Sequence, residues 1–144
     1  MRIINKLILS LLVLHITFTL LCSCGLVSPQ KYSCDVNEVE TINIVMLNEY
    51  VKDDYSYKYT VLSQISDCST FVDQLSKVDH TVNWGDPRQL QVQCVAIRID
   101  YLNGDFDLIQ PDAQIFNRSE VNQYGYYFFD DEQFDKLIAD YVTE

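Results

Sequence analysis

The sequence predicts an α+β domain: a mostly antiparallel sheet of about five to seven strands, with one internal and one C-terminal amphipathic helix. Three observations predict this class. Short segments concentrate β-branched and aromatic residues, Asn103-Gly104 is a strong hairpin signal, and two other segments repeat apolar residues at helical spacing. Because an amphipathic helix must bury its apolar stripe, both helices are expected to lie on the sheet.

The first two strands are predicted within residues 41–65. Residues 41–47 (TINIVML) are rich in β-branched residues, which favours a buried strand. After a turn at residues 52–54, apolar residues at positions 55, 57, 59 and 61 alternate with polar ones. A period of two is typical of a strand with one buried face.

Two helices are predicted from their caps and their periodicity. The first starts at Ser66 or Asp67, and its apolar residues lie at positions 68, 71, 72, 75 and 78. The second starts at Asp130, with Gln133 three residues later as in a capping box. Its apolar stripe consists of Phe134, Leu137, Ile138, Tyr141 and Val142. Its charged residues Asp131, Glu132, Asp135 and Lys136 are predicted to face water, and the acidic ones in the first turn suit the positive end of the helix dipole.

The chain between the helices is predicted to form strands, at residues 82–84, 90–101, 106–109, 115–116 and 126–129. The apolar residues of the longest one change phase near Cys94-Val95, which predicts either a bulge or a strong bend there. Asn103-Gly104 favours a two-residue type I′ turn. That turn places Tyr101 opposite Phe106 on the core side, and Asp100 opposite Asp107 on the outer side.

Residues 1–23 have the form of a secretory signal, in which Arg2 and Lys6 precede a long apolar run. The motif Leu21-Cys22-Ser23-Cys24 at its end resembles the lipobox of bacterial lipoproteins. The resemblance implies cleavage before Cys24 and its modification by diacylglyceryl and palmitate chains, which anchor by about 0.8 kcal/mol per buried methylene. The alternative is an uncleaved signal-anchor helix. In either case the basic residues predict a domain outside the cytoplasm.

The lipobox divides the chain into a signal peptide (1–23), a tether (24–40) and a single α+β domain (41–144) on the extracytoplasmic face of the cell membrane. Cleavage removes two basic residues and no acidic one, so the formal charge of −11 becomes −13. A charge of this size excludes a basic nucleic-acid surface and disfavours anionic lipids and wall polymers. Besides the bilayer that holds Cys24, we expect a cationic partner.

Three cysteines remain beyond Cys24, namely Cys34, Cys68 and Cys94. In an oxidising compartment two of them can pair and one is left over. Cys68 and Cys94 occupy apolar positions of predicted elements. They are therefore the candidate disulfide or, alternatively, two buried thiols.

The last two-thirds of the chain has a characteristic order of segments: Trp84-Gly85-Asp86-Pro87, the hairpin from Val95 to Ile109, Phe128-Phe129-Asp130, and then Phe134 to Tyr141. This order resembles small domains of low-GC Gram-positive bacteria. The matching residues are those of a hairpin and a docking helix. The resemblance therefore implies a fold and carries no activity.

The predicted hairpin gathers Asp100, Asp105 and Asp107, with Arg98 as a local counter-charge. Opposed carboxylates invite a cation, but the segment from Asp100 to Asp105 lacks the spacing of an EF-hand loop. We therefore expect a solvated acidic face and assign no metal site. No cofactor is expected either, because none of the four glycines lies in a phosphate-binding loop.

No catalytic residue is predicted, so the chain is not expected to be an enzyme. His80 is the only histidine beyond the signal, and it is expected at the surface. The sequence contains no nucleophile elbow, Walker loop or zinc-protease motif. Carboxylates are plentiful, so the alternative function is a cell-wall-acting, carboxylate-dependent hydrolase.

Aromatic residues are abundant for a domain of this size, with ten Tyr and seven Phe in the chain. Rows of them along strands predict either core packing or an exposed patch that binds a protein, peptide or glycan. The expected binding residues are Trp84, Asp100, Asp107, Tyr124 and Tyr126. The sequence thus predicts a membrane-anchored interaction module for a protein or peptide partner, such as an immunity-like protein that neutralises a cationic toxin.

Overall fold

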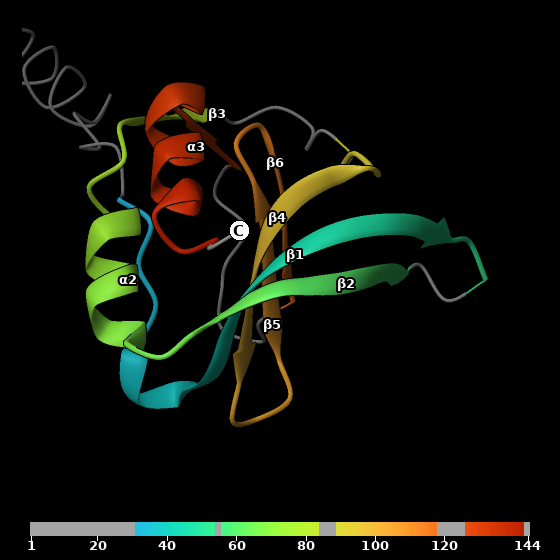
Figure 1. Cartoon of the computed structure of the whole chain (residues 1–144), viewed down its shortest axis with the longest axis horizontal. Coiled ribbons are helices and arrows are strands. Elements are labelled where there is room, and N and C mark those ends of the chain that lie inside the picture. Colours follow the sequence, from blue (N-terminus) through green and yellow to red (C-terminus); the bar gives the residue numbers. More distant parts are fainter. Residues whose placement is uncertain (1–30, 54–55, 84–88, 118–125, 143–144) are drawn as a thin grey trace, which may run out of the picture. The chain divides into compact units, whose positions relative to one another are not determined.

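The computed structural model of the chain describes residues 31–53, 56–83, 89–117 and 126–142 (Figure 1). Lys31–Glu144 form one compact unit. Its elements, in chain order, are the 3-10 helix η1 (Val36–Glu38), β1 (Val39–Val51), β2 (Ser56–Ile65), α2 (Cys68–Leu75), β3 (His80–Asn83), β4 (Cys94–Tyr101), β5 (Phe106–Gln110), β6 (Ala113–Asn117), β7 (Tyr126–Phe129) and α3 (Asp131–Ala139).

The described strands form two antiparallel sheets. The larger sheet has the strand order β2-β1-β4-β5-β6, and β3 pairs with β7 in a two-stranded sheet. Helix α2 lies between β2 and β3 in the chain, and α3 follows β7. The predicted α+β class, the mostly antiparallel sheet and the places of both helices are confirmed.

Both helices pack on the same face of the five-stranded sheet (Figure 1). The central strands supply the floor of this core with isoleucines that are 0% exposed, namely Ile42, Ile44, Ile97, Ile99 and Ile109. Phe71 of α2 and Phe134 of α3 are fully buried in the same cluster. Burial of each such side chain stabilises the fold by roughly 1.5–3 kcal/mol. The apolar stripes therefore hold both helices on the sheet.

Each helix begins at its predicted cap. Asp67 Oδ1 accepts the Thr70 N–H at 3.0 Å, and Asp130 Oδ1 accepts the Gln133 N–H at 2.9 Å. The hydrogen bonds from the Thr70 backbone and hydroxyl lower the pKa of Asp67. The Gln133 side chain turns to Asp79 instead of completing a capping box: its Nε2 donates to Asp79 Oδ2 at 2.8 Å, and its Oε1 accepts the Asp79 N–H at 3.0 Å. These bonds tie α3 to the residue before β3.

The register of the β4–β5 hairpin differs from the predicted one by one residue. Asp100 pairs with Phe106, and Ile99 pairs with Asp107. The predicted turn required Asp100 opposite Asp107. Since side chains alternate between the two faces of a sheet, a shift of one residue moves Asp107 from the outer face to the core face.

The loop of this hairpin explains the shift, because it has three residues and not two. The Tyr101 N–H donates to the Asp105 carbonyl at 3.0 Å, which closes the loop over residues 102–104. Gly104 lies in the left-handed region with φ 87°. Loops of this length with a left-handed glycine are the next most common type after two-residue turns.

Strand β4 begins at Cys94, later than the strand predicted from residue 90. The chain turns at residues 92–93, where Gln93 has φ 62° in the left-handed region. Leu90 lies before this turn and is buried with Val45 and Leu108 in a second cluster on the other face of the sheet. The change of apolar phase therefore marks two segments joined by a turn: of the two predicted alternatives, the strong bend is observed directly before Cys94, and a bulge within one strand is not.

The fold starts earlier than the predicted domain boundary at residue 41. Tyr32 is 1% exposed, and its ring lies 6.1, 6.0 and 6.4 Å from those of Phe116, Tyr127 and Phe129. Cys34 and Val36 also pack against the core beneath the helices. The last part of the predicted tether (24–40) therefore belongs to the domain.

Candidate functional site

The acidic face predicted on the hairpin is not formed. In the observed register Asp100 and Asp107 lie on opposite faces of the sheet. Asp107 is 0% exposed, so its side chain cannot meet a partner, and its predicted place on a binding surface is wrong. The cause is the extra loop residue, which turns Asp107 toward the core.

Asp107 is the centre of a buried hydrogen-bond cluster. Its Oδ2 accepts the hydroxyls of Tyr32 and Tyr101, each at 2.7 Å. Burial, followed by the charge of Asp107, raises the pKa of Tyr32 well above its ordinary value. Tyr32 therefore stays protonated and donates. A buried carboxylate with two donors satisfies the rule that buried polar groups are hydrogen-bonded, so the cluster has a structural role.

Asp100 is held on the outer face of the sheet by Arg98. Arg98 Nε lies 2.9 and 3.1 Å from the two carboxylate oxygens, and Nη2 lies 2.6 Å from Oδ1. The guanidinium also lies over the rings of Tyr59 and Phe106, 5.0 and 4.6 Å from their centroids. The predicted counter-charge role of Arg98 is confirmed for Asp100. Arg98 also lines a cavity of about 480 Å³. Its positive charge there is already balanced by Asp100.

Three predicted binding residues stay predictions. Trp84 and Tyr124 lie outside the described residues. Tyr126 begins β7 and pairs with Asn83, but its side chain also lies outside the described part.

The next residues of β7 contribute to the interior. His80 packs against the rings of Tyr127 and Phe129, with centroids 5.3 and 5.6 Å apart, and its Nδ1 lies 2.9 Å from the Val78 carbonyl oxygen. His80 is half-buried in this aromatic cluster, and its predicted surface position is wrong. For this part of the strand, core packing is the alternative that the structure adopts.

Cys68 and Cys94 do not form the predicted disulfide. Cys68 Sγ lies 3.8 Å from the Ile65 carbonyl oxygen, and Cys94 Sγ lies 3.7 Å from Gln91 Oε1. Cys68 packs at the edge of the helix-covered core, whereas Cys94 begins β4. The two cysteines are separate, half-buried thiols, whereas the alternative prediction was two buried ones.

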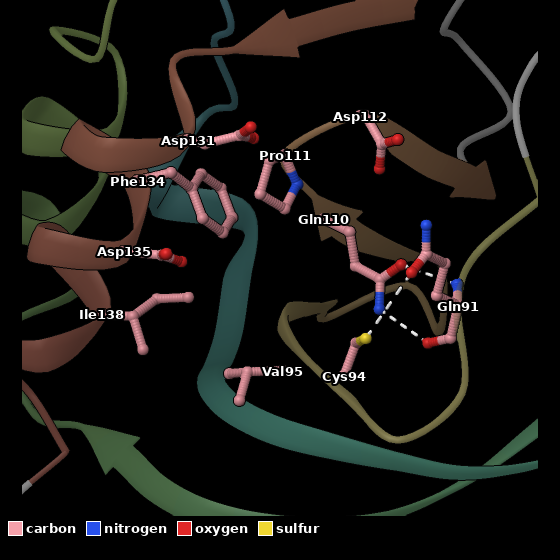
Figure 2. A pocket seen from close by; sticks show the side chains of 10 residues that line it. All are labelled: Gln91, Cys94, Val95, Gln110, Pro111, Asp112, Asp131, Phe134, Asp135 and Ile138. Atoms are coloured by element: carbon pink, nitrogen blue, oxygen red, sulfur yellow. Dashed lines mark hydrogen bonds between the residues drawn. The ribbon is translucent and has the colours of Figure 1, made fainter.

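The strongest candidate site is a cavity between α3 and the sheet, which we call the α3 pocket (Figure 2). Its volume is about 380 Å³, within the range of ligand pockets. One wall is a single face of α3, formed by Asp131, Phe134, Asp135 and Ile138. The opposite wall comes from the sheet and adjoining loops, with Gln91, Cys94, Val95, Gln110, Pro111 and Asp112.

A reciprocal pair of hydrogen bonds fixes the sheet side of the α3 pocket. Gln110 Oε1 accepts the Gln91 N–H, and Gln110 Nε2 donates to the Gln91 carbonyl, both at 2.8 Å. Gln110 is 2% exposed, so these bonds are shielded from water. They attach the segment before β4 to the end of β5 and place the Cys94 thiol at the cavity wall (Figure 2).

The rim of the α3 pocket is acidic. Asp131 and Asp135 are exposed and one helical turn apart, and Asp112 lies on the opposite side of the cavity (Figure 2). None of the ten described lining residues is basic. The carboxylates of Asp131 and Asp135 have no hydrogen-bond or ion-pair partner among the described residues. Their repulsion, a few tenths of a kcal/mol at this spacing, would be relieved by a cationic group.

Sequence reasoning placed Asp131 and Asp135 on the water-facing side of the last helix and did not single out Asp112 or the two glutamines. The spacing of four indicates that both acids share a helix face. The sequence does not indicate that the β5–β6 turn lies opposite that face, because this depends on how α3 docks on the sheet.

No protein-family model, curated protein or solved structure matches this chain. None of the helices in the described ranges has the length and apolar character needed to cross a membrane. Within the same part of the chain, no three His, Cys, Asp or Glu side chains converge as metal ligands would. The geometry of the α3 pocket is therefore the feature of the described chain that bears on its function.

Proposed function

We propose that this chain is a membrane-anchored, extracytoplasmic binding module whose partner is a cationic protein or peptide. The observation that carries the proposal is the α3 pocket, in which the exposed, unpaired carboxylates of Asp131 and Asp135 stand at the rim of a partly apolar cavity. The lipobox-like Leu21-Cys22-Ser23-Cys24 supports the location, and the formal charge of −11 supports the sign of the partner.

A lysine or arginine side chain of the partner suits the α3 pocket. Such a side chain buries its aliphatic stem on apolar surface and keeps its charged head near water. Val95 and Pro111, which are partly exposed, supply apolar surface in the cavity, whereas Asp131 and Asp135 stand at the rim where the head group would stop. Arginine adds two parallel hydrogen bonds to one carboxylate, which lysine cannot form.

The exposure of the rim carboxylates favours binding over the hydrolase alternative. A carboxyl that acts as a general acid near neutral pH is typically held in an apolar, desolvated site. Asp131 and Asp135 are instead exposed on the surface of α3. Exposed charges attract and orient a cationic partner without such desolvation.

Binding of a defined arginine peptide tests the site. The probe is an acetylated Gly-Arg-Gly amide, and binding to the full chain in a non-ionic detergent is followed by NMR shifts of the α3 amides. We expect the double variant Asp131→Asn, Asp135→Asn to weaken binding about tenfold, equivalent to about 1.4 kcal/mol. Binding should also weaken as salt screens the carboxylates.

The matched control removes the same charge from exposed residues of the same region that do not line the pocket, with Glu132→Gln and Asp140→Asn. This control should change binding less than about twofold, since their carboxylates act only at longer range. Equal losses in both double variants would show a general charge effect and reject the α3 pocket. Equal binding of the uncharged citrulline peptide would reject a cationic ligand.

The anchor has a separate test, the intact mass of the chain extracted from membranes. The proposal expects the mass of residues 24–144 plus acyl chains on Cys24. A chain that keeps residues 1–23 and carries no lipid would reject the anchor and leave the α3 pocket to be judged on peptide binding alone.

A further inference from the structure

A second cavity lies on the face of the five-stranded sheet opposite the helices, and we call it the outer cavity. Its volume is about 480 Å³, within the range of ligand pockets. Strands β4, β5 and β6 line it with Arg98, Phe106, Leu108, Ile115 and Asn117. In the sheet Leu108 pairs with both Arg98 and Ile115, and Phe106 pairs with Asn117. The register therefore places all five side chains on one face of the sheet.

The opposite wall of the outer cavity comes from the far edge of the same sheet. Strand β2 contributes Ser56 and Tyr57 to the lining, although three strands separate β2 from β6 in the strand order. In a flat sheet these two edge strands would lie about 19 Å apart. The sheet is instead strongly twisted, and Figure 1 shows β1 and β2 running across β5 and β6. This twist brings both edge strands to one hollow on the outer face.

Arg98 presents hydrogen-bond donors to the outer cavity. Its Nε and Nη2 contact Asp100, and its guanidinium packs over the rings of Tyr59 and Phe106, so the group is held in place. Within the described chain Nη1 has no hydrogen-bond partner, which leaves its two N–H groups for a ligand. The side-chain amide of the exposed Asn117 likewise has no partner among the described residues.

The lining of the outer cavity selects an uncharged ligand that has hydrogen-bond acceptors. Asp100 balances the charge of Arg98, and no other described lining residue is charged. An anion would be repelled by a chain of formal charge −11, and a cation would lie against Arg98. A purely apolar ligand would cover the N–H groups of Arg98 without replacing their bonds to water, which costs free energy.

We infer that the outer cavity binds a neutral saccharide. A sugar ring carries hydroxyls around its edge and C–H groups on its faces, so it combines acceptors with apolar surface. Tyr57 and Phe106 are half-buried and line the cavity, and the negative face of an aromatic ring attracts such C–H groups. Oxygen atoms of the sugar then accept hydrogen bonds from Arg98 Nη1 and from the Asn117 amide.

A neutral peptide also has acceptors, but the position of the outer cavity disfavours it. An extended peptide commonly binds by adding a strand at the edge of a sheet, where backbone groups are available. The outer cavity lies on a face of the sheet, where the ligand meets the side chains of Arg98, Phe106 and Asn117. Side-chain donors and aromatic rings are what a saccharide requires.

The outer cavity and the α3 pocket are independent sites. They share no lining residue, and α3 packs on the opposite face of the sheet. A neutral saccharide forms no ion pair, so salt should change its affinity by less than about twofold. Binding of the arginine peptide to the α3 pocket should weaken under the same change. The two proposals can therefore fail separately.

Titration of the full chain with uncharged trisaccharides tests the inference. The probes are maltotriose, cellotriose and the trimer of N-acetylglucosamine, in a polyoxyethylene detergent that contains no sugar. We expect at least one probe to shift the NMR signals of the β5 and β6 amides in a saturable manner. Asn117→Ala and Arg98→Lys should each raise its Kd about fivefold, the effect of one lost hydrogen bond. Lysine keeps the charge beside Asp100 but lacks the second edge of the guanidinium.

The matched control is Asn48→Ala, which changes an exposed asparagine that does not line the outer cavity. It should change the Kd by less than about twofold, since distant sites act independently. Circular dichroism checks that each variant is folded. Asn117→Ala alters no internal side-chain bond of the described chain, so it tests the cavity even where Arg98→Lys lowers stability.

Four outcomes would overturn the inference. The first is the absence of shifts with all three trisaccharides, and the second is an equal loss of affinity in Asn117→Ala and Asn48→Ala. Tighter binding of the anionic trigalacturonate would reject a neutral ligand. Equal shifts of the same amides by an acetylated Gly-Ser-Gly amide would assign the outer cavity to a peptide in place of a saccharide.

Discussion

The Tyr32 hydroxyl donates to Asp107 Oδ2 at 2.7 Å, and this bond joins the segment before β1 to the middle of the sheet, 75 residues later in the chain. Tyr101 donates to the same oxygen, also at 2.7 Å. Asp107 is 0% exposed and Tyr32 is 1% exposed, so water cannot replace either donor without opening the core. The N-terminal residues of the domain are thus fastened by a buried polar contact as well as by aromatic packing.

Removal of one donor should destabilise the domain measurably. We expect Tyr32→Phe to lower the free energy of unfolding by about 1–3 kcal/mol, because Asp107 keeps a buried carboxylate with one tyrosine donor fewer. Urea denaturation followed by circular dichroism measures the change. The control Tyr50→Phe alters a partly exposed tyrosine whose ring packs at a tilt against Tyr57, and it should change stability by less than about 0.5 kcal/mol. Equal losses in the two variants would reject a special role for the Tyr32 hydroxyl.

Alkaline pH should release the same contact. Burial, and then the charge of Asp107, raises the pKa of Tyr32 in the folded state. In the unfolded chain the pKa of a tyrosine is about 10. The folded state therefore keeps a proton that the unfolded state loses. The stability that Tyr32 contributes is complete below pH about 10 and is lost as pH rises toward the folded pKa.

The measurement is the difference in unfolding free energy between the unaltered chain and Tyr32→Phe as a function of pH. This difference should be constant up to about pH 9 and should shrink above about pH 10. The pKa of Tyr57 is also raised, chiefly by burial, but Tyr57 is present in both chains and cancels. A difference that stays constant through the alkaline range would contradict the assignment.

Features of the fold that are encoded locally could be predicted from the sequence. The caps at Asp67 and Asp130 depend on bonds to residues three positions away, and the apolar stripes depend on helical spacing alone. The hairpin at Asn103-Gly104 was also recognisable, because glycine tolerates the left-handed conformation that Gly104 adopts. These signals act over a few residues, and distant parts of the chain do not change them.

Features that depend on distant segments could not be predicted. A single extra loop residue moved Asp107 to the core, and a left-handed glycine after Asn103 is compatible with a two-residue as well as a three-residue loop. The sequence around Tyr32 resembles a tether, because the aromatic residues and Asp107 that bury Tyr32 lie far along the chain. The α3 pocket joins α3 to the β5–β6 turn and to Gln91, and no sequence period brings these segments together.

Gln114 helps to attach the two-stranded sheet to the larger one, together with the Phe129 N–H, which donates to the Pro111 carbonyl at 2.8 Å. Gln114 Oε1 accepts the Tyr127 N–H at 3.0 Å, and its Nε2 donates to the Tyr127 carbonyl at 2.7 Å and to the Gln110 carbonyl at 3.0 Å. Gln114 is 2% exposed. Its side chain bonds the backbone N–H and carbonyl of Tyr127 as the backbone of a neighbouring strand would. Strand β7 leads directly into α3, so this clamp also supports the wall of the α3 pocket.

Gln114→Ala should therefore loosen β7 before it affects the rest of the domain. Loss of the side chain removes the bonds that Gln114 makes to the N–H and carbonyl of Tyr127, and a buried polar group that loses its bond costs about 1–3 kcal/mol. We expect hydrogen exchange at the Tyr127 amide to become faster by at least about tenfold, since 1.4 kcal/mol is a factor of ten. The Phe71 amide, which donates to Asp67 at the start of α2, should keep its protection. The control Asn117→Ala changes an exposed residue of the same strand and should affect neither amide. Unchanged exchange at Tyr127 would contradict the clamp, and an equal increase at Phe71 would show global destabilisation in place of local opening.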